Sequence, residues 1–479
     1  MALLGLITLS IVLALGFIHA PRDWKGTRPI VSSYVVVLIG ISLYILAPSI
    51  LILTSGSYTW AAHYYSEETF ARTIWLSVLA LVAFLYGNAL SRRGRMPRFD
   101  DFPVHSTGSD TRPSRRSEDV VLLALLGLGL ACKIVLIVNT GGIADSVTRM
   151  STYAREFSGV GLLDPGAILL RTISGIADGA AAWGVLRALR NRHRAKTWLL
   201  ILLVMLSLSY VTTGKRLVLL LPIICVLVGV HIYRRPLTTR LVPIVLALAI
   251  GIGFVTLMAR VFLPASVQGY NINLDNVAYA NGSVLQFYLY SLEFATAEMI
   301  SVAIIAREDI VNMFGGTWDA MFITNFDPFL YSVPRALWPG KPSELYDLSY
   351  GISAALGATP FEDPTVGYAS TLIGTSYLLG GVIGVMAAMF AFGFLTARID
   401  FRLARQHWTD MSVILFAIGL VVVFHLFRQG TLGWTFIVSI VQQYGAIAAL
   451  LVLAMISRPK RSVRKSDSKQ MVSAENADP

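Results

Sequence analysis

Residues 333–342 read Val333-Pro-Arg-Ala-Leu-Trp-Pro-Gly-Lys-Pro342, a proline-rich segment that contains two cations. The segment lies near the end of a polar region, residues 263–368, that separates two long apolar parts of the chain. Both apolar parts contain windows of about 18 or more residues with almost no charge, the length that crosses a bilayer core of about 30 Å. We therefore predict a bundle of membrane helices that carries one large outer loop.

The composition favours a membrane protein over a soluble one. Hydrophobic residues make up 55% of the 479 residues and charged residues 14%, whereas a soluble globular protein contains about 25% charged residues. The formal net charge of +11 would suit a nucleic-acid-binding protein, but the basic residues concentrate in connections between apolar segments. We therefore expect an all-α polytopic membrane protein without a nucleic-acid partner.

Charge also predicts the orientation of the bundle. We predict about 11 transmembrane helices, at residues 2–19, 30–54, 73–91, 119–138, 166–187, 198–213, 217–233, 241–262, 369–397, 411–427 and 434–457. More than two thirds of the 39 Lys and Arg residues lie in alternate connections, at 20–29, 92–118, 187–197, 234–240, 398–410 and the tail from Arg458. Cytoplasmic connections are rich in Lys and Arg. This pattern predicts a cytoplasmic C-terminus and an N-terminus on the outer side.

The predicted spans divide the chain into four parts. These are helices 1–8 with a flexible cytoplasmic linker at 92–118 in residues 1–262, the outer loop 263–368, helices 9–11 in residues 369–457, and a basic, disordered tail at 458–479. Within the loop, residues 284–306 are apolar but contain Glu293 and Glu298, which are costly at bilayer depth. We expect this segment to lie at the membrane interface or to dip in without crossing.

Three groups of cations on the predicted outer side could bind an anionic lipid headgroup. Arg335 and Lys341 lie among prolines, which restrict the backbone and hold the two side chains in place. Lys215 and Arg216 lie in the short turn Thr212-Thr-Gly-Lys-Arg216, and Arg428 ends the segment Phe424-His-Leu-Phe-Arg428. Arg binds phosphate through two parallel hydrogen bonds and Lys adds a point charge. Pairing with nearby acids, or snorkelling to lipid headgroups, is the alternative for these cations.

Together the three groups predict a clamp for pyrophosphate. Fixed cations would stabilise the charge that develops on a pyrophosphate leaving group without a metal ion. We expect Arg216, Arg335 and Lys341 to contribute most, followed by Lys215 and Arg428. Three further cations, Lys133, Arg171 and Arg260, lie near the edges of apolar segments, where snorkelling explains them; Arg171 is the strongest functional candidate among the three.

A hydroxyl that attacks such a substrate needs a general base. Glu362 and Asp363 are the first candidates because they precede the span that closes the loop. Glu293, Glu298 and His425 are alternatives, although a lone histidine near a helix end is more often structural. The sequence contains no cluster of His, Asp and Glu with metal-ligand spacing, so we expect no metal ion and no cofactor.

Three motifs follow one another along the chain. They are a G-x-R turn at Gly214-Lys-Arg216, a P-R-x-L-x-P-x-K-P element at Pro334–Pro342, and a G-x-x-Y-x-x-G-x-x-G form that begins at Gly374. In this order, over roughly residues 130–440, they resemble the bacterial O-antigen polymerase family, the oligosaccharide repeat-unit polymerases. Members of that family often have Glu after the glycine of the third motif, where this chain has Thr375.

The resemblance implies a membrane glycosyltransferase of GT-C-like architecture. It would polymerise oligosaccharide repeat units carried on undecaprenyl pyrophosphate, at the periplasmic face of the bacterial inner membrane, into an O-antigen or exopolysaccharide. Membrane lipid, a flippase and a chain-length regulator are the further partners it implies. The alternatives are an O-antigen ligase, which uses the same donor, a flippase or exporter of lipid-linked oligosaccharide, and a scaffold subunit of an envelope complex. The absence of an evident internal repeat weakens the transporter alternative.

Overall fold

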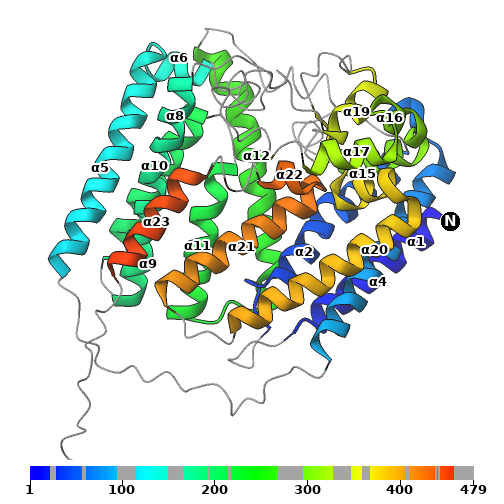
Figure 1. The fold of residues 1–479 in the computed structure, drawn as a ribbon, viewed down its shortest axis with the longest axis horizontal. Coiled ribbons are helices and arrows are strands. Elements are labelled where there is room, and N and C mark those ends of the chain that lie inside the picture. The colour runs from blue at the N-terminus through cyan, green and yellow to red at the C-terminus, as the bar shows by residue number, and fades with distance from the viewer. Residues whose placement is uncertain are drawn as a thin grey trace, which may run out of the picture.

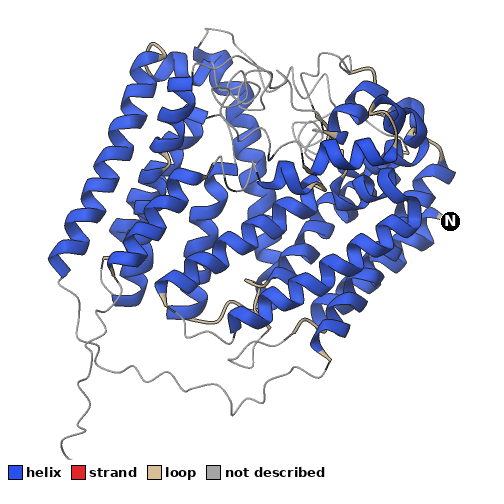
Figure 2. Cartoon of the chain, in the orientation of Figure 1, coloured by secondary structure: helices blue, strands red, loops and turns tan. Residues whose placement is uncertain are grey.

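The described part of the chain is helical. The computed structural model describes residues 1–21, 28–56, 61–93, 115–148, 165–191, 194–213, 217–267, 295–326, 329, 347–358, 367–404, 409–436, 440 and 443–457. Within these ranges no β-strand occurs (Figure 2). One isolated bridge joins Pro29 to Thr238. The prediction of an all-α protein is confirmed.

Long helices lie side by side and form the body of the molecule (Figure 1). The part before the outer loop consists of α1 (Ala2–Ile18), α2 (Ser33–Ile41), a π-helical turn (Ser42–Leu46), α3 (Ala47–Ser55), α4 (Glu67–Arg92), α5 (Arg115–Asn139), α6 (Ile143–Thr148), α8 (Pro165–Ser174), α9 (Ile176–Asn191), α10 (Ala195–Thr213), α11 (Leu217–Tyr233) and α12 (Val242–Val267). The part after the loop consists of α20 (Thr371–Ala404), α21 (Asp410–Gln429), α22 (Leu432–Phe436) and α23 (Tyr444–Ile456).

Six helical segments of the described residues are long and apolar enough to cross a membrane. They are Ser33–Ser55, Glu67–Arg92, Ser117–Asn139, Ala195–Thr213, Thr371–Phe401 and Asp410–Gln429. Shorter apolar helices include Ala2–Ile18, Val218–Tyr233 and Tyr444–Ile456. These segments agree with a polytopic membrane protein, while the count of 11 spans and their orientation stay predictions.

Breaks interrupt two of the predicted spans. The span predicted at 166–187 is interrupted at Gly175, between α8 and α9, and the span predicted at 369–397 is kinked within α20 at Gly381, whose φ of 58° and ψ of −151° are not helical. The span predicted at 434–457 contains α22 and α23, and residues 437–439 and 441–442 between them lie outside the described part. Hydropathy averages over a window and therefore cannot report a local change of backbone direction. Glycine at position 175 favours the first break, because glycine lowers helix propensity by about 1 kcal/mol relative to alanine.

Helices α4 and α20 approach each other closely, and two glycines make that approach possible. A Cβ atom at Gly87 would clash with the carbonyl of Phe390, and one at Gly393 would clash with the carbonyl of Phe84. Each glycine therefore lets the backbone of the other helix come within van der Waals contact. Asn88 adds a polar link, because its side-chain amide donates to the Gly393 carbonyl at 3.2 Å.

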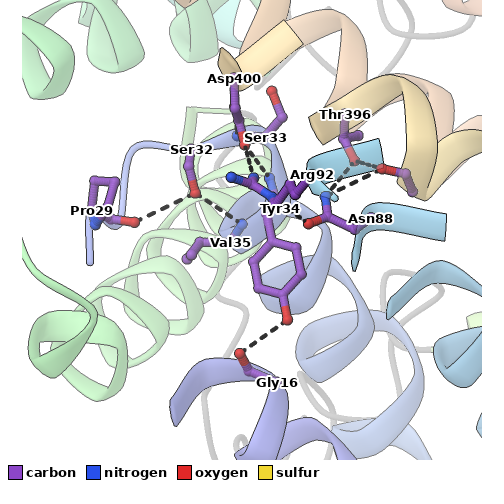
Figure 3. Close-up of polar contacts among 11 residues, drawn as sticks. Gly16, Pro29, Ser32, Ser33, Tyr34, Val35, Asn88, Arg92, Thr396 and Asp400 are labelled. Carbon is purple, nitrogen blue, oxygen red and sulfur yellow. Dashed lines mark hydrogen bonds and ion pairs between the residues drawn. The ribbon is translucent and has the colours of Figure 1, made fainter. Parts of the chain in front are cut away.

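A polar network joins one end of α4, α20 and α2 (Figure 3). Asp400 accepts hydrogen bonds from the backbone amides of Ser33 at 2.8 Å and Tyr34 at 3.3 Å. These amides belong to the first turn of α2, where the backbone N–H groups have no hydrogen-bond acceptor within the helix. Arg92 lies 3.6 Å from the same carboxylate and donates to Asn88 at 2.8 Å. The carboxylate of α20 thus caps α2 and neutralises Arg92.

The same end of the bundle gathers several connections that the charge pattern assigns to one side. Ile30 donates to the Leu237 carbonyl at 2.8 Å, which joins the connection before α2 to the one after α11. Asp410, at the start of α21, forms an ion pair with Arg190 of α9 and accepts a hydrogen bond from Tyr233 of α11. The grouping of these connections agrees with the predicted topology.

The described part of the outer loop forms a small helical unit beside α1, α4 and α20 (Figure 1). It consists of α15 (Thr296–Ile305), α16 (Arg307–Met313), α17 (Thr317–Asn325) and α19 (Leu348–Ala355). The 10 residues of α15 extend about 15 Å, which is half of the bilayer core. Helix α15 is therefore too short to cross on its own. Its Glu298 is buried and accepts a hydrogen bond from the Ala61 amide at 3.1 Å.

Candidate functional site

Most of the predicted site residues lie outside the described residues. These are Lys215, Arg216, Arg335, Lys341, Glu362 and Asp363, together with Glu293 among the alternative bases. The roles predicted for them stay predictions. His425 and Arg428 are described, and both lie in the last two turns of α21.

The end of α21 fixes the position of Arg428. Helix α21 begins with a capping box between Thr409 and Ser412 and ends at Gly430, whose φ of 81° is in the left-handed region that glycine favours. Arg428 lies in the last turn, where a cation interacts favourably with the helix dipole. Its guanidinium carbon is 5.8 Å from the centre of the Tyr44 ring, a distance that suits a cation–π contact. His425, one turn earlier, is fully buried.

A buried carboxyl group lies at the corner that follows α21. Asp347 is 3% exposed, and its Oδ1 accepts a hydrogen bond from the Ser349 amide at 3.0 Å as the N-cap of α19. The Thr431 hydroxyl donates to its Oδ2 at 3.5 Å. Burial raises the pKa of Asp347 to about 6, although these hydrogen bonds oppose the shift. A carboxyl with such a pKa can exchange a proton near neutral pH.

Further hydroxyl and amide groups lie on the segments next to Thr431. Thr431 and Thr435 lie one turn apart and are buried, and the Leu432 amide donates to Asn325 Oδ1 at 3.0 Å. The hydroxyls of Thr435 and of the buried Thr324 have no hydrogen-bond partner in the described part of the chain. We call Asp347, Asn325, Thr431 and Thr435 the outer polar cluster. It offers one proton acceptor and several neutral hydrogen-bonding groups, a set that suits a sugar, and Arg428 precedes Thr431 by three residues in the chain and lies against Tyr44.

Asp347 was not among the acids that the sequence predicted as candidate bases. One signal was available: Asp347 stands two residues before Ser349 at the start of an apolar helix, which is an N-cap pattern. That pattern predicts a helix start and says nothing about burial. The contact with Thr431, 84 residues further along the chain, depends on tertiary structure.

The expectation that Lys133 snorkels to the membrane surface is wrong. Its side chain is 0% exposed and its Nζ lies 3.1 Å from Asp178 Oδ2. Ser209 bonds to both residues, so the three side chains join α5, α9 and α10. The sequence around Lys133 suggested that this residue lies near the edge of a membrane span. Its charge is instead neutralised by the carboxylate of Asp178 on α9. Arg171 is also buried, on α8. The side chain of Arg260 lies outside the described part.

No group of three or more His, Cys, Asp and Glu residues that could hold a metal ion occurs among the described residues. The described part of the candidate site consists of the carboxyl and hydroxyl groups of the outer polar cluster, with Arg428 on the preceding helix.

A comparison with protein families identifies the wider group to which these features belong. The family described as O-antigen polysaccharide polymerase Wzy matches residues 4–461, nearly the whole chain. The chain belongs to the Wzy family of O-antigen polymerases. No curated protein and no solved structure matches the chain. The resemblance predicted from the three motifs is thus confirmed, and membership of the Wzy family agrees with an integral membrane protein.

In this Wzy-family polymerase the third motif lies against the end of α21. A Cβ atom at Gly430 would clash with the Thr375 hydroxyl. Thr375 is buried, and its hydroxyl lies 3.5 Å from that of Ser370. The larger Glu of the family motif would be crowded at this position. Thr431, which follows Gly430, is the residue that contacts Asp347, so a carboxyl is present close to the position where the family motif has one.

Proposed function

We propose that this Wzy-family polymerase joins oligosaccharide repeat units carried on undecaprenyl pyrophosphate, at the periplasmic face of the bacterial inner membrane. The growing chain leaves its lipid carrier and is added to the non-reducing end of a new lipid-linked unit. The observation that supports this proposal most is the family match over residues 4–461. The outer polar cluster adds chemistry of the required kind at one end of the membrane helices.

The leaving group of this reaction is a lipid pyrophosphate, which gains negative charge as the sugar–phosphate bond breaks. Fixed Arg and Lys side chains can stabilise that charge without a metal ion. We assign this role to Arg216, Arg335 and Lys341, with Lys215 and Arg428 in support. The position of Arg428 at the end of α21, against Tyr44, agrees with this role.

The attacking sugar hydroxyl must lose a proton. We propose Asp347 as the acceptor, in addition to Glu362 and Asp363, because its carboxyl is buried, has a raised pKa and lies next to Thr431. The bond from the Thr431 hydroxyl orients the carboxylate. In this sequence Asp347 would take the place of the glutamate that other family members often have at the position of Thr375.

The polymerase reaction is tested by reconstitution. Purified protein in proteoliposomes is supplied with a defined undecaprenyl-pyrophosphate-linked repeat unit, and the products are separated by length. We expect a ladder of polymers and free undecaprenyl pyrophosphate. A preparation that binds the substrate but forms no ladder would contradict the proposal.

A deletion strain separates the alternatives. Loss of a polymerase leaves lipid A capped with single repeat units, whereas loss of a ligase removes all capping. Loss of a flippase leaves unpolymerised units on the cytoplasmic side. Single-unit capping that is reversed by the wild-type gene is therefore the expected result.

The clamp is tested in the same strain. Arg216→Ala and Arg335→Ala should each shorten or abolish the polymer while the protein remains in the membrane. Arg72→Ala is a matched control, because Arg72 is exposed and pairs with Glu68 one turn away on the same helix. Wild-type polymer from both clamp variants would contradict this assignment.

A further inference from the structure

Helix α23 begins deep inside the predicted membrane layer. Its 13 residues extend about 20 Å, and the basic tail begins just after its other end, at Arg458. Basic residues mark the boundary of the apolar layer. Because that layer is about 30 Å thick, Gln443, the residue before the helix, lies about 10 Å inside the opposite boundary.

Gln443 has a buried side chain with no hydrogen-bond partner among the described residues. It is 3% exposed, and neither Nε2 nor Oε1 has a partner there. The side chain does not cap α23. Exchanging the two amide atoms does not change this result, since both are unpaired. An unsatisfied polar group is costly at this depth, so a native structure is expected to provide it with a ligand or a water molecule.

The break between α8 and α9 lies next to the start of α23. A Cβ atom at Gly445 would clash with the carbonyl of Thr172, so the start of α23 packs directly on the end of α8. The break between α8 and α9, at Gly175, is three residues after this contact. Arg171 and Ser174, which lie on either side of Thr172 in the chain, are both buried. Broken helices at membrane depth occur where the backbone lines a cavity or a binding site.

The chemistry of Gln443 restricts the ligand. Oε1 needs a hydrogen-bond donor and Nε2 needs an acceptor. A deprotonated phosphate can only accept hydrogen bonds, and a prenyl chain can do neither. A sugar hydroxyl both donates and accepts. We propose that Gln443, where the start of α23 packs on the end of α8, forms a subsite for a sugar ring of the lipid-linked repeat unit. This inference rests on the proposed function, from which the sugar substrate is taken.

The test compares binding and stability in the same variants. Gln443→Met keeps the length of the side chain and removes both polar atoms, and Gln443→Leu is a second variant in case the first does not fold. Removing an unpaired buried amide should leave the melting temperature equal or higher. Affinity for a prenyl-pyrophosphate-linked repeat unit should fall about tenfold, while affinity for prenyl pyrophosphate without sugar should not change. Ser42→Ala is the control, because that buried hydroxyl donates to its own helix at Leu38.

Two results would overturn the subsite. If the Gln443 variants bind the sugar-bearing probe as the wild type does, the amide binds only water. If they lose affinity equally for prenyl pyrophosphate without sugar, Gln443 contacts the phosphate side and the sugar assignment is wrong. These failures differ from failure of the proposed function, in which the wild-type protein itself forms no polymer from the lipid-linked unit.

Discussion

Asp347 Oδ2 lies 3.5 Å from the hydroxyl of Thr431, which brings a carboxyl of the outer loop to the corner between α21 and α22. The two residues are fully or almost fully buried. Asp347 is the N-cap of α19, and through Thr431 and Gly430 it is also a neighbour of Thr375 in the family motif. Structural and catalytic roles of Asp347 therefore have to be separated by experiment.

The pH dependence of polymerisation tests the catalytic role. Asp347 must be deprotonated to accept a proton, and burial raises its pKa to about 6. The rate should therefore fall as the pH decreases through about 6. Asp347→Asn should reduce the rate by about 100-fold or more, because an amide cannot accept the proton. The measurement is the initial rate of polymer formation in proteoliposomes between about pH 5 and pH 8.

Stability measurements on the same variants provide the control. Asn caps a helix about as well as Asp, whereas Ala costs about 1 kcal/mol. A carboxyl with a raised pKa stabilises the fold at low pH, and this contribution is lost as the pH rises through the folded pKa. Asp347→Asn should therefore be at least as stable as the wild type at about pH 8, and Asp347→Ala less stable than Asp347→Asn. If Asp347→Asn is fully active, Asp347 is not the proton acceptor and only caps α19.

The Lys133–Asp178 pair predicts a strong non-additive effect on stability. Lys133→Met leaves an unpaired carboxylate next to Ser209 in the interior, and breaking a buried pair in this way costs about 3–5 kcal/mol. Replacing both residues, as in Lys133→Met with Asp178→Leu, should recover most of that loss. Fluorescence-detected size-exclusion chromatography after heating measures the effect. A double variant whose loss equals the sum of the losses of Lys133→Met and Asp178→Leu would show that the pair is not coupled.

The contact between α4 and α20 predicts opposite effects of one substitution at different glycines. Gly87→Ala and Gly393→Ala should each force the two helices apart and lower the melting temperature, because the added methyl group meets backbone carbonyls. Gly127→Ala on α5 is the matched control, since no neighbouring atom lies within 4 Å of the position that its Cβ would take. Alanine there should be neutral or stabilising by up to about 1 kcal/mol. Similar melting temperatures for all three variants would contradict the close approach.

Asp400 predicts a further difference between a partly buried and an exposed ion pair. Asp400→Ala removes the acceptor of two α2 amides and leaves Arg92 without its carboxylate. The loss should be about 1–3 kcal/mol, the cost of unsatisfied buried groups. Glu68→Ala breaks an exposed pair with Arg72 on α4 and should change stability by less than about 1 kcal/mol. Thermal melting of both variants in the same detergent compares them directly.

Composition and local pattern were enough to establish the class of the protein and its family. Runs of apolar residues interrupted by basic connections are one-dimensional signals, because the bilayer requires spans of a minimum length and the membrane boundary attracts Lys and Arg. The three motifs were also sufficient to predict the family that the match over residues 4–461 confirms. Neither inference needed contacts between distant residues.

Contacts between polar residues that are distant in the chain could be identified only from the packing of the helices. Lys133 and Asp178 are 45 residues apart in the chain, and Asp347 and Thr431 are 84 apart. Whether a charge reaches the membrane surface or finds a partner on another helix depends on this packing, which hydropathy does not encode. The amide of Gln443 is likewise found to be buried and unpaired among the described residues only when the packed helices are considered. Residues 333–342 led us to predict that the loop 263–368 carries the chemistry, and the described residues add Asp347, Thr431 and Gln443 as groups on which that chemistry can be tested.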